Sequence, residues 1–285
     1  IFTRNRMSIL YGKGVSSWQL TPYRREIGAY AYTIQDIGYT MFLDDPGISS
    51  LKSSQAFGNF SNASLSARIK TWVDGKRGLA VASVVSRNKS QYRLFFSDGW
   101  VLYVTFSGAK IVGMMPCKLT NAASCAWSSE ESDGTETIYF GSTDGMVYQM
   151  EKGTSFDGGA IVYHINLAWD WLGSPQLIKR FHDASLEISG DGYAEFSFSY
   201  RLGYGSTEIA QPEAQNEVTS FSLARWDEFT WDDFVWDGQT LFPSRVDMGG
   251  EAENVSLILR GDSDYHESIR FSGASLAWAP RRYLR

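Results

Sequence analysis

Paired carboxylates occur at Asp44-Asp45, Glu130-Glu131 and Asp232-Asp233, and Asp262-Ser-Asp264 sets two more close together. Two carboxylates that converge on one pocket can serve as the acid and base of a glycosidase. Each of the three pairs stands in a polar, turn-like stretch, so we interpret them as solvated surface charge. The run 262–264 lacks the additional spaced oxygens that a calcium loop needs, and we expect it to form a hairpin turn.

The remaining reactive side chains are few and scattered. His164, His182 and His266 stand far apart, and Cys117 and Cys125 have neither metal-site spacing nor a disulfide framework. No nucleophile elbow, phosphate-binding loop or His-Glu-x-x-His pattern occurs. We therefore predict a protein without catalytic activity, cofactor or metal, with reduced cysteines.

The composition predicts a folded protein that does not bind nucleic acid through its phosphates. Hydrophobic residues make up 43% and charged residues 20% of the 285 residues, enough for a substantial core. The net charge of −6 argues against binding phosphates with a basic face. No apolar run approaches the roughly 20 residues that cross a bilayer, and no signal peptide is present. Since the sequence opens on Ile1 and already reads as a strand, we expect part of a longer chain.

A local pattern recurs in the first half: a strand end, a polar turn closing on glycine, and a second, alternating strand. The turn glycines are Gly14, Gly47, Gly99 and Gly145, separated by 33, 52 and 46 residues. Glycine is expected there because tight hairpin turns require a positive φ. The separations are close to the length of a four-stranded propeller blade. We predict three to four β-propeller-like blades over residues 1–158, with further strands at 27–33, 78–83 and 111–115; ordinary hairpins in a sandwich remain the alternative.

The pattern changes near residue 158. Phe196, Phe198 and Tyr200 alternate with polar residues, which is typical of a strand with one buried face. Several such runs follow one another up to the basic end of the sequence. We expect residues 159–285 to form an antiparallel β-sandwich platform, so that the whole chain is all-β.

An aromatic arm, residues 225–238, interrupts this second region. Its tryptophans recur every five residues, a period that fits neither helix nor strand. Such an array is costly in water, so we predict that it packs on a neighbouring subunit; packing back on its own sandwich is the alternative. The predicted subunit contacts are Trp226, Trp231, Trp236, Phe229, Phe234, Arg281, Arg282 and Arg285.

Several stretches together resemble the tail nozzle, or packaged-DNA stabilisation, proteins of short-tailed bacteriophages. The resemblance covers residues 95–285, while the earlier part agrees only in its blade-like character, and members of that family are usually longer. The matching stretches are Tyr139-Phe-Gly-Ser-Thr-Asp-Gly-Met-Val-Tyr-Gln-Met150, Thr154-Ser-Phe-Asp-Gly158, Leu172-Gly-Ser-Pro175, Lys179-Arg180-Phe181, the Trp-Asp repeat, Asn254-Val-Ser-Leu-Ile258 and Arg281-Arg282-Tyr283.

The resemblance implies a structural virion protein, assembled in the host cytoplasm into a homo-oligomeric ring of about six copies below the portal and adaptor. The genome is retained behind this ring and leaves through it without sequence-specific binding. An acidic conduit suits that passage, because each neutralised phosphate would slow the DNA.

Two other functions remain open. Residues 141–148 also resemble a blade of quinoprotein-type propellers, which oxidise alcohols or sugars with a bound quinone and calcium. A carbohydrate-binding module is the second, because exposed aromatic rings stack on sugars; Trp226, Trp231 and Trp236 would carry that function.

Overall fold

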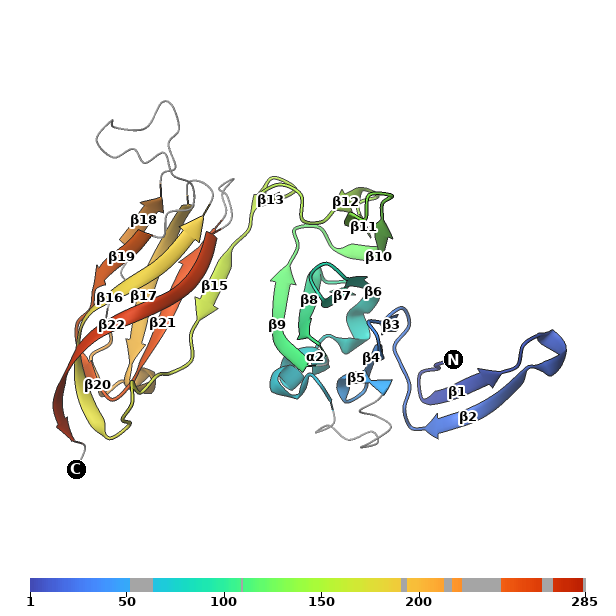
Figure 1. Cartoon of the computed structure of the whole chain (residues 1–285), viewed down its shortest axis with the longest axis horizontal. Coiled ribbons are helices and arrows are strands. Elements are labelled where there is room, and N and C mark those ends of the chain that lie inside the picture. Colours follow the sequence, from blue (N-terminus) through green and yellow to red (C-terminus); the bar gives the residue numbers. More distant parts are fainter. Residues whose placement is uncertain are drawn as a thin grey trace. The chain divides into compact units, whose positions relative to one another are not determined.

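Antiparallel β-sheets make up most of the computed structural model (Figure 1), which confirms the all-β expectation. The structure describes residues 1–51, 64–108, 110–190, 194–212, 217–221, 242–262 and 269–283. The chain divides into two units, Ile1–Lys152 and Gly153–Arg285. Among the described residues, no helix is long and apolar enough to span a membrane.

Three consecutive meanders form the body of the first unit. Their sheet orders are β3-β4-β5, β6-β7-β8-β9 and β10-β11-β12, so each strand pairs with its sequence neighbour. Short helical turns precede the second meander. The elements are β3 (Gln35–Asp36), β4 (Thr40–Asp44), β5 (Gly47–Ser50), η3 (Ala67–Ile69), α2 (Lys70–Asp74), η4 (Arg77–Leu79), β6 (Ala80–Ser86), β7 (Gln91–Phe96), β8 (Trp100–Ser107), β9 (Lys110–Lys118), β10 (Ala123–Glu130), β11 (Glu136–Ser142) and β12 (Val147–Gln149).

The turn glycines behave as predicted in three of four cases. Gly47, Gly99 and Gly145 have φ values of 124°, 83° and 87°, and each lies where a hairpin turns. Gly14 is the exception: its φ of −162° is extended backbone, so the prediction for this glycine is wrong. The left-handed residue of that hairpin is Gly12, with φ 127°, because a short 3₁₀ turn, η1 (Val15–Ser17), makes the connection longer than two residues.

The predicted strand at 27–33 is also wrong. Gly28 passes so close to Arg4 that a side chain there would meet the Arg4 carbonyl oxygen. The amides of this segment donate to scattered acceptors, as when Ala29 N donates to Thr3 O (3.0 Å) and Tyr30 N donates to Leu43 O (2.9 Å). Because no continuous ladder forms, the segment is irregular although its first residues are buried.

The first two meanders share one hydrophobic core. It takes Met41 and Leu43 from β4, Tyr92 and Leu94 from β7, and further residues from β5, β8 and α2. Each fully buried side chain of this size stabilises the fold by about 1.5–3 kcal/mol relative to exposure, so this core holds the two sheets together. The third meander adjoins the second through Phe140, whose ring centroid lies 6.2 Å from that of Phe95.

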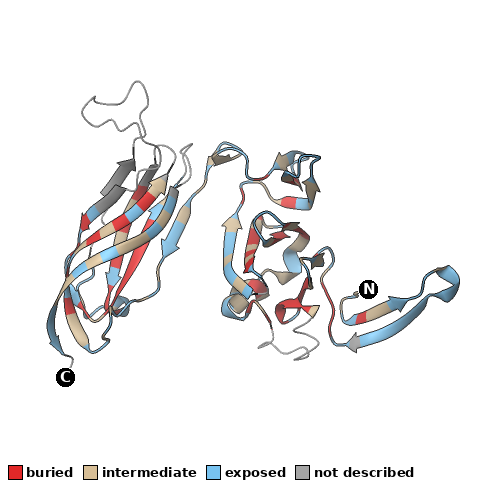
Figure 2. Cartoon of the chain, viewed as in Figure 1, coloured by how far each residue is buried: buried red, intermediate tan, exposed pale blue. Residues whose placement is uncertain are grey.

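A separate hairpin precedes the meanders. Its strands, β1 (Arg6–Tyr11) and β2 (Gln19–Arg25), pair with one another in a two-stranded sheet. Figure 2 shows the hairpin mostly exposed away from its base. The base is fixed by a cluster in which Met7 packs with Ile27, Ala29 and Phe42.

The second unit contains two larger sheets. One has the order β15-β21-β17-β18; in the other, β16 lies between β22 on one side and β19 and β20 on the other. The elements are β13 (Ser155–Phe156), β14 (Gly159–Ala160), β15 (Tyr163–Asn166), β16 (Leu177–Gly190), β17 (Ala194–Leu202), η5 (Gly203–Gly205), β18 (Glu217–Phe221), β19 (Phe242–Asp247), β20 (Glu251–Ala252), β21 (Val255–Gly261) and β22 (Ile269–Tyr283).

Both sheets contribute to one core. Phe196, Phe198 and Tyr200 on β17 are buried, as their alternation predicts, while the intervening serines are only partly buried. They pack in the same cluster as Leu186 and Ile188 from β16. The period-two pattern therefore identifies the buried face of this strand correctly.

Candidate functional site

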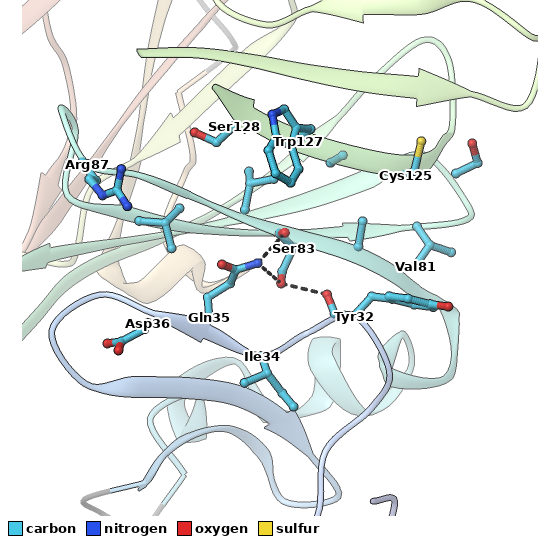
Figure 3. Close-up of a pocket in the computed structure, with 15 residues that line it drawn as sticks. Tyr32, Ile34, Gln35, Asp36, Val81, Ser83, Arg87, Cys125, Trp127 and Ser128 are labelled. Carbon is cyan, nitrogen blue, oxygen red and sulfur yellow. Dashed lines mark hydrogen bonds between the residues drawn. The ribbon is translucent and has the colours of Figure 1, made fainter. Parts of the chain in front are cut away.

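The first strands of the three meanders border a groove of about 930 Å3 (Figure 3). Five consecutive residues of β6 and five of β10 line it, so the groove runs along strand backbones as well as side chains. Among the strands that the structure describes, neither β6 nor β10 has a partner on its second side. The lining residues are Tyr32, Ile34, Gln35, Asp36, Val81, Ala82, Ser83, Val84, Val85, Arg87, Ser124, Cys125, Ala126, Trp127 and Ser128.

Polar groups in the groove are largely engaged with one another. The Gln35 side chain donates from Nε2 to the Ser83 carbonyl oxygen (2.8 Å) and to Ser83 Oγ (3.1 Å). Ser83 Oγ in turn donates to the Tyr32 carbonyl oxygen (2.8 Å). This chain of bonds, drawn in Figure 3, ties β3 to the open edge of β6. It stabilises the wall of the groove and leaves few convergent polar groups for a ligand.

Two aromatic rings at the groove are exposed to solvent. Tyr32 is 79% exposed and holds a positive φ of 60°, and Trp127 on β10 is 70% exposed. Figure 3 shows them on opposite walls. Exposed rings in this setting can stack on a flat apolar face of a ligand.

The groove offers no nucleophile with an adjacent base. One cysteine, Cys125, lines the groove. Neither of the two described histidines, His164 and His182, is among the lining residues. Over the residues that the structure describes, no group of three or more His, Cys, Asp or Glu side chains is arranged to hold a metal ion.

Glu136 joins the second meander to the third. Its carboxylate accepts bonds from the amides of Arg87 (3.0 Å) and Asn88 (3.2 Å) and from the hydroxyls of Ser86 and Ser128 (both 3.1 Å). Burial acts to raise the pKa of Glu136, but these donors outweigh it and hold the pKa below its ordinary value.

Arg93 makes a second connection between the same meanders. Its guanidinium is fully buried, donates to Gln91 Oε1 and pairs with Glu151, which also binds Lys89 at 3.0 Å. Burial acts to raise the pKa of Glu151, but the two cations outweigh it and the pKa lies below its ordinary value. Such a paired, buried charge is a structural link between the two meanders, and neither Arg93 nor Glu151 lines the groove.

The carboxylate pairs predicted to be solvated differ from one another. Asp44 is buried, which raises its pKa, and Arg4 binds both Asp44 (3.3 Å) and Asp45. The interpretation as solvated charge is therefore wrong for Asp44, because the pair anchors the base of the β1–β2 hairpin. Glu130 and Glu131 lie at the exposed end of β10, as expected. The pair at 232–233 lies outside the described residues.

Two of the eight predicted subunit contacts, Arg281 and Arg282, lie in the described part of the chain. Trp226, Phe229, Trp231, Phe234 and Trp236 of the aromatic arm, and Arg285, lie outside the described residues. Arg281 and Arg282 are exposed on β22. Arg281 Nε donates to Glu251 Oε1 of the same chain (3.0 Å), so one of its bonds is internal.

Sequence reasoning missed the exposed surface of the β1–β2 hairpin. Read as part of a blade, it was expected to bury one face, yet its outer part exposes Leu10, Tyr11, Val15, Trp18 and Leu20. The sequence does carry a sign of this: apolar residues occupy both the even and the odd positions of these strands, whereas a strand with one buried face has them at every second position.

A scan against protein-family models finds no match to this chain, and a search of curated proteins finds none either.

Proposed function

We propose that this chain is a structural subunit of the tail of a short-tailed bacteriophage, part of a nozzle ring below the portal and adaptor. In this role it forms part of the conduit that retains and then releases the genome, and it performs no catalysis. The observation that carries the proposal is the amount of large apolar surface left in water, including Val15, Trp127, Val147 and Val162, each at least 70% exposed. A protein that works alone rarely leaves so much apolar area uncovered, whereas an assembly subunit buries it against neighbours.

The finer architecture follows from the sheets. We assign the three meanders as propeller-like blades, because their first strands, β3, β6 and β10, border one groove, as inner strands border the axis of a propeller. We assign the second unit as a β-sandwich, because its two sheets share one core. In the proposed ring, the sandwich forms the platform.

Native mass spectrometry and negative-stain imaging of the purified protein test this function. A ring of about six copies with an open bore is expected. A protein that stays monomeric up to high concentration, and that also fails to bind portal rings, would refute the nozzle proposal. Binding to portal rings without self-assembly would place the chain in the tail but not as a self-assembling ring.

A carbohydrate-binding function is the second candidate, and the groove favours it. Tyr32 and Trp127 present exposed rings on opposite walls, the arrangement in which sugar rings are stacked. A glycan array followed by titration of Trp fluorescence tests this. Binding that disappears in Trp127→Ala but persists in Trp171→Ala, where an exposed ring outside the groove is removed, would favour the sugar-binding function.

A further inference from the structure

Two segments of the first unit each contain charged residues of one sign only, and the two signs are opposite. Residues 1–25, here called the basic arm, contain five Arg and Lys side chains and no Asp or Glu. Residues 119–151, the acidic sheet built on β10, β11 and β12, contain six Asp and Glu side chains and no Arg, Lys or His. In a chain with net charge −6, this segregation gives the two segments opposite net charge. Arg4 is already paired with Asp44 and Asp45, and Glu151 with Lys89 and Arg93, so the remaining charged groups are the ones available to a partner.

The basic arm also presents apolar side chains on both of its faces. Leu10 and Leu20 are paired across the strands and therefore share one face, and they are 43% and 58% exposed. Tyr11 is the next residue along β1 and points to the other face, at 55% exposure. Trp18, at 54%, follows the 3₁₀ turn of the arm. A two-stranded hairpin is marginally stable in water by itself, so a covering partner would stabilise it.

The acidic sheet has matching apolar groups. Trp127 on β10 is 70% exposed, and Met146 and Val147 at the start of β12 are 61% and 72% exposed. β12 is the last strand of its sheet, and no strand of the described residues pairs with its outer edge. Glu130, Glu131, Asp133 and Asp144 of the same segment are exposed, and Glu130 also pairs with Arg87 of the second meander at 3.4 Å.

We propose that the basic arm of one copy of this chain binds the acidic sheet of a second copy. The contact joins two different surfaces, so it repeats from copy to copy and closes a ring when the rotation allows. It rests on the proposed function in that it names the contact that holds such a ring together. Met7 and the contacts of Arg4 with Asp44 and Asp45 anchor the base of the arm to the first unit, and its outer part is left for the partner to cover.

Zero-length carbodiimide cross-linking tests the contact directly. Lys13 is the single lysine of residues 1–51, so a link from it to a carboxylate reports on the arm alone. Equal amounts of 14N-labelled and 15N-labelled protein are mixed, cross-linked and digested. Links between Lys13 and the carboxylates at 130–144 are expected in pairs of mixed isotope. Lys13 links found only within single copies, or no Lys13 links in a sample that assembles, would overturn the proposal.

Complementation between two variants tests the direction of the contact. Leu10→Ser/Leu20→Ser damages the arm and leaves the sheet intact, and Trp127→Ser/Val147→Ser does the reverse. All four side chains are exposed, so folding should persist, which circular dichroism verifies. Each variant alone should associate roughly tenfold more weakly or worse. An equimolar mixture should form a two-copy complex that does not grow, because one functional arm meets one functional sheet. Val112→Ser, at a residue of β9 that is 60% exposed and belongs to neither surface, is the control and should assemble normally.

The outcomes separate this contact from the ring itself. If the wild-type protein forms rings and both double variants form the same rings, the arm contact is overturned and the nozzle proposal stands. Assemblies that depend on the arm but form closed pairs would support the contact and refute the ring. A wild-type protein that never self-associates overturns the arm contact, and it refutes the nozzle proposal as well if it also fails to bind portal rings. Binding to DNA duplexes that is lost in Lys13→Glu but kept in Leu10→Ser/Leu20→Ser, with no mixed-isotope links, would assign the arm to the genome and overturn the proposal.

Discussion

Replacing Glu136 with Gln should loosen the turn between β6 and β7. The carboxylate accepts two amide bonds, from Arg87 and Asn88, and two hydroxyl bonds. A glutamine keeps one acceptor oxygen, while its NH2 group would face a donor. Hydrogen bonds to a charged group contribute about 1.5–3 kcal/mol when buried, and partial exposure reduces this. We expect a local loss of about 1–2 kcal/mol, which corresponds to a roughly 5- to 30-fold larger opening equilibrium.

Hydrogen exchange followed by mass spectrometry measures this opening at the turn. Peptides covering residues 84–92 should exchange faster in Glu136→Gln by that factor, while peptides of the second unit stay unchanged. Glu131→Gln is the control, because the Glu131 carboxylate accepts one long bond, from Thr137 Oγ1 at 3.4 Å. Equal exchange in wild type and Glu136→Gln would refute the inference that this carboxylate clamps the turn.

The same substitution predicts a pH dependence. The pKa of Glu136 in the folded protein lies below its ordinary value of 4.5, so its contribution to stability is fully present above pH 4.5. It is lost as the pH falls through the folded-state pKa. The ratio of exchange rates between Glu136→Gln and wild type should therefore shrink towards one below that pH. A ratio that stays constant from pH 7 to pH 3 would contradict this.

Three further substitutions or treatments have defined outcomes. Lys179→Met should lower the unfolding free energy of the second unit, measured by urea denaturation, by about 2–4 kcal/mol. The reason is that the buried ammonium donates to the carbonyls of Ser174, Leu177 and Glu253. A loss below about 0.5 kcal/mol would contradict this. Gly99→Ala should cost about 1–2 kcal/mol, because φ there is 83°, and an unchanged melting temperature would contradict it. A maleimide should label exposed Cys125 well before Cys117, whose pKa is raised by burial; equal labelling rates, read by intact mass, would contradict that order.

The all-β architecture was predictable because it depends on short-range rules. An Asp-Gly turn such as Asp98-Gly99 needs a positive φ whatever the tertiary context, and a period-two run such as that of β17 has one possible buried face. Gly14 shows the limit of the first rule. A glycine near a turn is not always the left-handed residue, because the length of the connection decides which position is strained.

The groove and the inter-sheet links were not predictable. Gln35, Ser83 and Trp127 meet only because three meanders are brought together, and no local pattern encodes that meeting. The same holds for Glu136 and Arg93, which reach across to another meander. The segregation of charge between residues 1–25 and 119–151, by contrast, is visible in the sequence. It gains meaning only once the exposed apolar groups of both segments are located.

The pairing of β16 with β22 decides how the second unit responds to mechanical load. Leu177 at the start of β16 pairs with Tyr283 at the end of β22, so the chain enters and leaves this ribbon at the same end. Tension between those two points would unzip the ribbon one residue pair at a time instead of shearing all pairs together. The buried ammonium of Lys179, opposite Pro280, and the Arg281–Glu251 ion pair lie at that end. A force that opens the ribbon from this end must therefore first expose the buried Lys179 ammonium and break the Arg281–Glu251 ion pair.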